Sequence, residues 1–172
     1  MKIIHTSDWH LGQNFFGYDR SKDHEAMIEQ LVKLVHEEKP DALIIAGDIY
    51  DIAVPGTAVQ KNFAEYIVTL HNSHPEMTIV CISGNHDSAS RHEVYQTPWE
   101  ALNVKMVGKI DMASPANNII EILAHQFPFL EGKLYCLDVW TPATYRRFVN
   151  SQIGSYMSFI LPSKKIPLRT GN

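Results

Sequence analysis

The sequence has few cysteines and no long apolar run, and each shortage argues against a class of protein. Two cysteines in 172 residues, Cys81 and Cys136, are too few for a disulfide framework and fall in apolar stretches typical of buried, reduced thiols. No apolar stretch approaches the roughly 20 residues of a membrane helix. The N-terminus opens on a strand pattern instead of a basic, apolar signal segment. We therefore expect a cytoplasmic protein with no membrane segment.

An excess of positive charge is also missing. The 15 lysines and arginines stand against 19 aspartates and glutamates, a formal net charge of -4, which argues against nucleic-acid binding by bulk charge alone. A metal-dependent nuclease remains compatible with this balance, because two divalent cations bring about four positive charges to their own site. With 45% hydrophobic and 20% charged residues, the composition is that of one ordinary globular domain.

The first ninety residues alternate between short apolar runs and amphipathic segments. The apolar runs at 2–7, 42–46 and 79–82 are continuous, as in strands that are buried on both faces. Between them, residues 21–39 and 59–72 carry apolar side chains at helical spacing. This β-α-β-α-β order predicts an α/β fold with a parallel sheet and flanking helices.

The pattern weakens after this unit. The expected elements are a short helix followed by three strands, the last two forming a hairpin, over residues 93–102, 104–107, 119–123 and 134–140. We expect one domain over residues 1–160. Residues 161–172 are expected to form a polar tail, because they contain no pattern that would build a core.

Polar side chains of metal-binding type follow each of the first three predicted strands. The clusters are Asp8-x-His10, Gly47-Asp48-x-x-Asp51 and Gly84-Asn85-His86-Asp87. Because the carboxyl ends of parallel strands lie at one edge of a sheet, the three clusters should meet there. A mixture of carboxylate, imidazole and amide ligands suits Mn, Fe or Zn better than Mg. The pattern therefore predicts a catalytic metal site.

The donor types predict two ions in that site. Asp8 and His10 can both reach one ion. Asp48 can bridge two ions with its two oxygens, and Asn85 offers an amide oxygen to the second. His86 is expected to protonate the leaving oxygen of a phosphate ester or to donate a hydrogen bond to the charge that develops on it. Such a site hydrolyses phosphoesters.

Other residues in and near the clusters are expected to play supporting roles. Asp87 is expected to orient the neighbouring imidazole and fix its tautomer. Asp51 is expected to cap or orient a loop instead of binding metal, and His24 to lie on a helix surface. The aromatic residues of the first loop, Phe15, Phe16 and Tyr18, are expected to form a hydrophobic cover; the alternative is a platform for stacking bases.

The three clusters resemble the first three motifs of the calcineurin-like metallophosphoesterases. The longer stretch Ile4-His5-Thr6-Ser7-Asp8-Trp9-His10-Leu11-Gly12, with Gly84-Asn85-His86-Asp87-Ser88, is similar to the SbcD-type nuclease subunits of bacterial DNA-repair complexes. The resemblance covers residues 1 to about 110 and implies the layered sheet and flanking helices of that family.

The resemblance also implies roles for the site residues. By it, Asp8 and His10 hold the first metal, Asp48 bridges, Asn85 holds the second metal and His86 is the catalytic histidine. It further implies two Mn²⁺ ions, exonuclease and endonuclease activity on DNA, an SbcC-type ATPase partner and a homodimer.

The sequence departs from the family downstream of the third cluster. The family completes its metal site with a later histidine and a Gly-His-x-His segment, and no such segment follows His86. The later histidines are His92 and His125, and His125 faintly resembles the family's single-histidine motif. The chain is therefore expected to be an N-terminal portion of the domain, incomplete at its C-terminus. The alternatives are a phosphatase or cyclic-nucleotide phosphodiesterase on the same scaffold, or a non-catalytic binding subunit.

Overall fold

A parallel sheet forms the centre of the computed structural model. The structure describes residues 2–94, 96–109, 113–114, 119–123 and 131–135. Within this part the sheet has four strands in the order β1 (Ile3–Thr6), β4 (Ala42–Ala46), β5 (Thr78–Ile82) and β6 (Val104–Val107). The predicted α/β fold is confirmed. The predicted tail at 161–172 and His125 lie outside the described residues.

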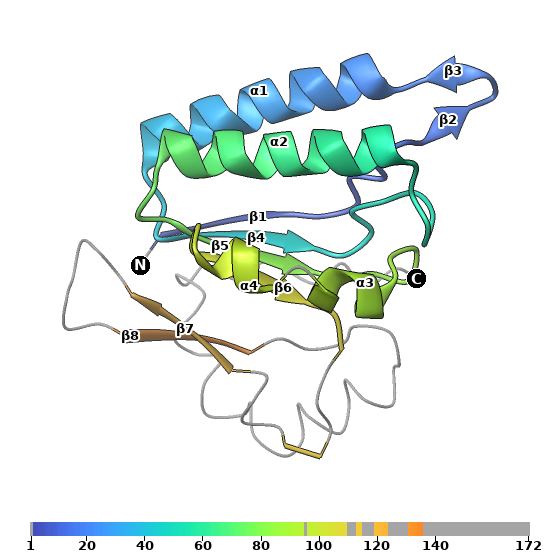
Figure 1. Ribbon diagram of the computed structural model, residues 1–172. Coiled ribbons are helices and arrows are strands. Elements are labelled where there is room, and N and C mark those ends of the chain that lie inside the picture. Colours follow the sequence, from blue (N-terminus) through green and yellow to red (C-terminus); the bar gives the residue numbers. More distant parts are fainter. Residues whose placement is uncertain (1, 95, 110–112, 115–118, 124–130, 136–172) are drawn as a thin grey trace, which may run out of the picture. The chain divides into compact units, whose positions relative to one another are not determined.

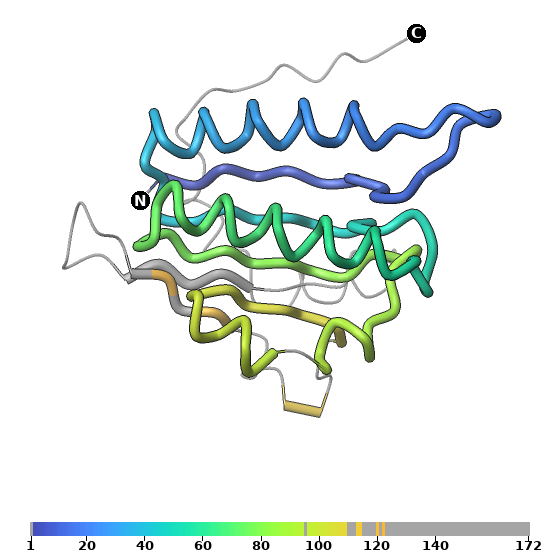
Figure 2. Tube along the Cα trace, turned by 45° about the horizontal axis from the view of Figure 1, so that its top comes forward, coloured from blue at the N-terminus to red at the C-terminus, as the bar shows by residue number. Residues whose placement is uncertain are grey.

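Two long helices connect the first three strands of the sheet. Helix α1 (Ser21–Glu38) leads from β1 to β4, and α2 (Thr57–Ser73) leads from β4 to β5. They lie side by side over one face of the sheet (Figures 1 and 2). Their buried residues pack on the branched strand residues in one core, which includes Ile28, Val35, Leu43, Ile45, Phe63, Ile67, Leu70 and Ile79. Burial of this apolar surface is the main force that holds the helices to the sheet.

The later elements match the predictions in kind but differ in their bounds. The short helix predicted over 93–102 is two helices, α3 (Ala89–Val94) and α4 (Gln96–Glu100). The predicted hairpin is present as β7 (Ile119–Leu123) and β8 (Glu131–Tyr135), which pair antiparallel. Its second strand begins before the predicted residue 134. None of the helices in the described residues combines the length and hydropathy needed to cross a membrane.

The first loop contains a small hairpin that the sequence pattern did not predict. Strands β2 (Asn14–Phe15) and β3 (Tyr18–Asp19) pair antiparallel, and Phe16 and Gly17 form the turn with φ values of 51° and 87°. Turns of this kind need two residues with positive φ. Phe16 is 95% exposed, and Phe15 and Tyr18 are also exposed. The expectation that these aromatics form a buried cover is therefore wrong.

The strand register brings the first two polar clusters to a common edge. Thr6 of β1 pairs with Ile45 of β4, and Ala46 pairs with Ile82 of β5. Since the three strands are parallel and end at the same level, the loops that follow them leave the sheet together. The edge at which they leave is where an open parallel sheet places its ligands.

Candidate metal centre

Backbone hydrogen bonds join the loop after β1 to the loop after β4. The amide of Asp8 donates to the carbonyl of Gly47 at 3.1 Å, and that of His10 donates to the carbonyl of Asp48 at 2.9 Å. The amide of Leu11 continues the ladder to the carbonyl of Ile49 at 2.9 Å. These bonds extend the pairing of β1 and β4 beyond the strands and set the first two clusters next to each other.

Three of the predicted ligand residues have a left-handed backbone. The φ values are 56° at Asp8, 46° at His10 and 45° at Asp48, and Gly47 beside them has a φ of 83°. For a residue with a side chain this conformation costs about 1–2 kcal/mol. Strain of this kind persists where the surrounding contacts enforce it, and it occurs often at functional sites. Here the inter-loop ladder supplies those contacts.

Asp8, His10 and Asp48 converge on one point. Each offers a ligand atom, and these atoms lie within 4.8 Å of one another. Nε2 of His10 is 3.9 Å from Oδ2 of Asp48. Since a carboxylate or imidazole ligand binds a transition-metal ion at about 2.0–2.2 Å, one ion between them can contact all three side chains after small adjustments.

The amide of Asn85 faces the carboxylate of Asp48. The end of the amide that faces Asp48 lies 3.1 Å from Oδ1 and 2.9 Å from Oδ2. With the amide oxygen at that end, three acceptor atoms face one another, and a cation among them would satisfy all three. With the amide turned over, its nitrogen would donate to both carboxylate oxygens. The donor set therefore fits a metal ion shared by Asp48 and Asn85.

Asp51 connects two histidines of the site. Its Oδ1 lies 3.1 Å from Nδ1 of His10, and its backbone carbonyl accepts a hydrogen bond from Nδ1 of His86 at 2.7 Å. The two rings pack edge to face with their centroids 5.0 Å apart. His10, Asp51 and His86 also offer atoms within 4.8 Å of one another. Asp51 thus contacts a predicted ligand directly, beyond the loop-orienting role expected for it.

The pKa of the His86 imidazole is raised above its ordinary value. The first cause is the hydrogen bond to the Asp51 carbonyl, which stabilises the protonated ring. The nearby carboxylates of Asp48, Asp51 and Asp87 act in the same direction. His86 is exposed, and because Nδ1 is engaged with the carbonyl, Nε2 is the ring nitrogen left to meet a ligand.

Two residues that sequence reasoning missed support this arrangement. Gln13 donates from Nε2 to Oδ1 of Asp51 at 3.2 Å. Arg20 in turn donates from Nη1 to Oε1 of Gln13. Neither residue belongs to a polar cluster after a strand, so no motif identifies them. Together they form a hydrogen-bonded chain from the start of α1 to Asp51.

Asp87 holds two of the loops together. Its carboxylate accepts hydrogen bonds from the backbone amides of Gly84 at 2.8 Å, Ile49 at 3.0 Å and Tyr50 at 2.9 Å. It is 8% exposed. In the part of the chain that the structure describes, it makes no hydrogen bond to His86, so the partner that orients that imidazole is the Asp51 carbonyl instead of the Asp87 carboxylate.

His24 is buried, and the expectation that it lies on a helix surface is wrong. It is 4% exposed and sits in the first turns of α1, against the backbone of Trp9. Burial lowers the pKa of its imidazole. Trp9, also buried, donates from Nε1 to Oγ1 of Thr6 at 3.0 Å. The residue between Asp8 and His10 is thus anchored in the core, which fixes the loop on which both stand.

Comparison with curated proteins finds relatives of one kind, the SbcD subunit of the SbcCD nuclease. The one from Rhodobacter capsulatus is 34% identical over 110 residues, which are 64% of this chain and 27% of the relative. The Escherichia coli K12 protein of the same name is 36% identical over 90 residues, 52% of this chain and 22% of the relative. That of Staphylococcus saprophyticus is 28% identical over 176 residues, covering 100% of this chain and 46% of the relative. The chain therefore spans less than half the length of these relatives.

A family model and a solved structure complete the comparison. The crystal structure of Pseudomonas putida nuclease MPE matches with a TM-score of 0.41 and 23% identity, over 66% of this chain and 50% of that one. The model of the calcineurin-like phosphoesterases matches residues 1–163. Because this match extends over nearly the whole sequence, the chain belongs to the calcineurin-like phosphoesterase family and is related to the SbcD nuclease subunits.

Proposed function

We propose that this chain carries the hydrolytic site of a manganese-dependent DNA nuclease of SbcD type. The observation that carries the proposal is the convergence of carboxylate, imidazole and amide groups from three loops at one sheet edge. The relatives whose names include a nuclease support DNA as the substrate. The reaction is the hydrolysis of a phosphodiester bond, as an exonuclease and an endonuclease.

The ligand roles follow from the positions of the side chains. Asp8 and His10 would hold the first ion, Asp48 would bridge, and Asn85 would hold the second. Two Mn²⁺ ions held there would activate a water molecule and neutralise the charge on the phosphate. The donors are mixed nitrogen and oxygen groups, which favours Mn²⁺ over Mg²⁺. Asp51 would keep the His10 ring in place through its contact with Nδ1.

His86 would act on the phosphate directly. Its Nδ1 is bonded to the Asp51 carbonyl, and its raised pKa favours the protonated ring. A protonated Nε2 can give its proton to the leaving oxygen or donate a hydrogen bond to the charge that builds up on the phosphoryl oxygens. The ring is exposed, so a substrate strand can reach it.

The proposal extends to partners. By likeness to the SbcD relatives, we infer an SbcC-type ATPase, a DNA substrate and a second copy of the chain as partners. A phosphatase or cyclic-nucleotide phosphodiesterase would use the same site. One observation favours a metal-binding chain without hydrolytic activity: no Gly-His-x-His segment follows His86.

The test combines metal content and turnover on one sample. The chain is loaded with Mn²⁺, desalted and analysed for metal per chain, and then assayed on duplex DNA and on a small aryl phosphodiester. We expect two ions per chain and DNA hydrolysis that His86→Ala reduces at least about a hundredfold. His36→Ala is the matched control, because His36 is exposed in the last turn of α1.

The other results select between the alternatives. Turnover of the small diester without DNA cleavage would replace the nuclease with a small-molecule phosphodiesterase. Bound metal without turnover of either substrate would support the non-hydrolytic chain. Sedimentation at high concentration tests the homodimer separately, and a monomer there would contradict it.

A further inference from the structure

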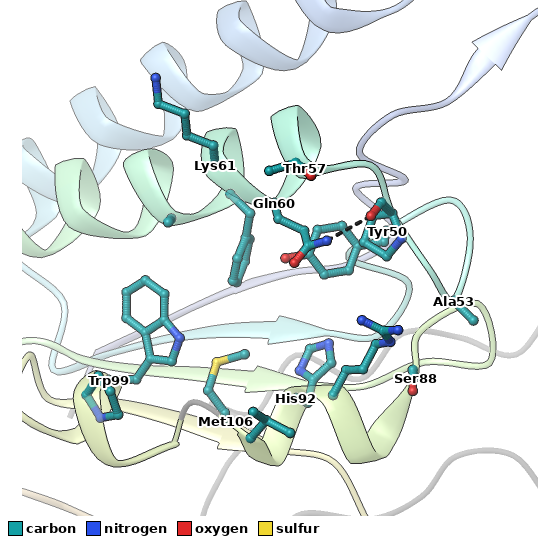
Figure 3. A pocket seen from close by; sticks show the side chains of 15 residues that line it. Tyr50, Ala53, Thr57, Gln60, Lys61, Ser88, His92, Trp99 and Met106 are labelled. Carbon is teal, nitrogen blue, oxygen red and sulfur yellow. Dashed lines mark hydrogen bonds between the residues drawn. The ribbon is translucent and has the colours of Figure 1, made fainter.

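A cavity of about 490 Å³ lies next to the metal centre, on the helix side of the sheet. It is bounded by α2, α3, α4, β6 and the loop after β4 (Figure 3). Aromatic and thioether side chains supply much of its wall, namely Tyr50, Phe63, Trp99 and Met106. The ring of Phe63 packs edge to face against Tyr50 at 5.4 Å and against Trp99 at 6.2 Å. Its volume falls within the range of small-molecule sites, about 300–1,000 Å³.

His92 lines this cavity with both ring nitrogens unpaired. It is 4% exposed, and neither Nδ1 nor Nε2 has a hydrogen-bond partner among the described residues. Figure 3 shows His92 and Met106 pointing into the cavity from one side, with Trp99 at one end and Ser88 at the other. An unpaired buried polar group costs about 1–3 kcal/mol. A ligand that offers a donor and an acceptor would relieve that cost.

The mouth of the cavity carries a positive charge. Arg91 is exposed there, one residue before His92. The other cation of the lining, Lys61, already pairs with Glu65 at 3.5 Å, and Gln60 donates its amide to the carbonyl of Pro55. Arg91 is therefore the lining cation best placed to receive an anionic group.

We propose that this pocket binds the base of a nucleotide, with the aromatic wall against the base, His92 on its hydrogen-bonding edge and Arg91 toward its phosphate. A base has apolar faces and an edge that carries donors and acceptors together, which matches an apolar wall with one imidazole. A sugar would need more hydrogen-bonding groups than this lining offers. A purely apolar molecule would leave His92 unpaired. The proposal rests on the proposed function, which makes nucleic acid the substrate.

Occupation of the pocket would reach the metal centre through Asp87. Nε2 of His92 lies 4.0 Å from Oδ1 of Asp87. The Asp87 carboxylate holds the amides of Ile49 and Gly84, which are neighbours of Asp48 and Asn85. A base that fixes the His92 ring would therefore stabilise the loops that carry these two predicted ligands. Bound nucleotide should tighten Mn²⁺ binding, and Mn²⁺ should tighten nucleotide binding by the same factor.

The experiment measures nucleotide binding by the full chain with its metals removed by EDTA. Deoxyadenosine 5′-monophosphate, thymidine 5′-monophosphate and deoxyribose 5-phosphate are titrated by calorimetry, and tryptophan fluorescence is followed in parallel. We expect saturable binding of the nucleotides, no binding of the sugar phosphate, and a fluorescence change that Trp99→Phe removes. His92→Phe should weaken binding about tenfold or more, because it removes both hydrogen-bonding atoms but keeps a ring of similar size.

A surface variant keeps the test decisive if His92→Phe does not fold. Arg91→Gln should weaken the nucleotides severalfold, and Lys22→Gln, an exposed site on α1, should not. Equal affinity for deoxyribose 5-phosphate and the nucleotides, binding that appears only with Mn²⁺ present, or no binding at millimolar concentration would overturn the proposal.

Competition identifies the source of the base. Displacement of the mononucleotide by a short single-stranded oligonucleotide, and not by the same oligonucleotide made abasic, would identify a substrate base. Displacement only by free nucleotides would identify an effector site; either result supports the pocket. Because binding is measured without metal, it can succeed where hydrolysis fails, and the two proposals can fail separately.

Discussion

Oδ2 of Asp87 accepts a hydrogen bond at 3.0 Å from the backbone amide of Ile49, a residue 38 positions earlier in the chain. The same oxygen accepts the amide of Gly84 at 2.8 Å. One buried carboxylate thus joins the loop after β4 to the loop after β5. Because Asp48 stands in the first of these loops and Asn85 in the second, Asp87 determines how closely these two predicted ligands approach.

The first prediction concerns this carboxylate. Asp87→Asn replaces one of two acceptor oxygens with an N–H₂ group that would face backbone donors. We expect a loss of about 1–3 kcal/mol in the free energy of unfolding and weaker Mn²⁺ binding. Urea unfolding and manganese titration measure the two effects. Asp23→Asn, at an exposed carboxylate on α1, is the control and should change stability by less than about 1 kcal/mol. An Asp87→Asn protein with unchanged stability and metal affinity would contradict the joining role.

The second prediction concerns the close approach of Gly84 to Asp48. A Cβ added at Gly84 would lie within 2.2 Å of both the backbone nitrogen and Oδ1 of Asp48. Gly84→Ala must therefore separate the loops, and we expect a loss of about 1–3 kcal/mol in stability together with the loss of tight metal binding. At Gly56, the N-cap of α2, a Cβ meets no atom within 4 Å, so Gly56→Ala should stay within about 1 kcal/mol of the parent. Similar behaviour of the two variants would contradict the steric argument.

Much of the fold could be predicted because its signals are local. The runs at β1, β4 and β5 are continuous and branched, and the α1 pattern ends at Lys39, whose φ of 45° closes the helix before Pro40. The polar clusters then follow from the rule that parallel strands end at one edge. The hairpin at β2 and β3 gave no such signal, since Phe16 is a poor residue for a turn position with positive φ.

The supporting contacts of the candidate site could not be predicted, because they depend on backbone groups and on distant residues. Asp87 stands next to His86 in sequence, but its carboxylate turns to the amides of Ile49 and Tyr50. The role expected for Asp87 is taken by the carbonyl of Asp51, and every residue has a carbonyl. His24 was misplaced because α1 buries its first turns against the loop of Trp9, a contact between elements that helical periodicity does not show.

The third prediction concerns pH and the buried histidines. Burial lowers the pKa of His24 and of His92 below the ordinary value near 6.5 that both regain on unfolding. Above that pH both states are neutral. Below it the unfolded chain binds protons that the folded chain resists, so the free energy of unfolding should fall by up to about 1.4 kcal/mol per pH unit for each histidine. The raised pKa of His86 acts in the opposite direction.

Variants assign this pH dependence to individual residues. Unfolding in urea at pH 7.5, 6.5 and 5.5 gives the slope of stability against pH. His24→Gln keeps a donor for the Trp9 backbone but does not titrate, so its slope should be shallower than that of the parent. His36→Gln, at an exposed position, should leave the slope unchanged. His86 is present in all of these proteins, so its contribution cancels in the comparison. Identical slopes in the three proteins would show that burial of His24 does not control acid stability.

The last prediction concerns Asp51, which the sequence assigned to loop structure and which lies against His10 in the fold. Asp51→Asn keeps the shape of the side chain and removes its charge. If the carboxylate holds Nδ1 of His10 as a donor, so that Nε2 is free for metal, the substitution should weaken Mn²⁺ binding about 10- to 100-fold. The fold should be affected much less, because the side chain is only half-buried and the backbone contacts of Asp51 remain.

A matched variant separates the charge of Asp51 from its packing. Gln13→Ala removes the neutral donor at 3.2 Å from the same carboxylate oxygen and leaves the charge in place. It should therefore weaken Mn²⁺ binding severalfold at most. Manganese titration of both variants, with unfolding midpoints measured in parallel, gives the comparison. If Gln13→Ala weakened the metal as much as Asp51→Asn, loop position would govern affinity; a larger effect of Asp51→Asn would show that the carboxylate acts on the His10 ring itself.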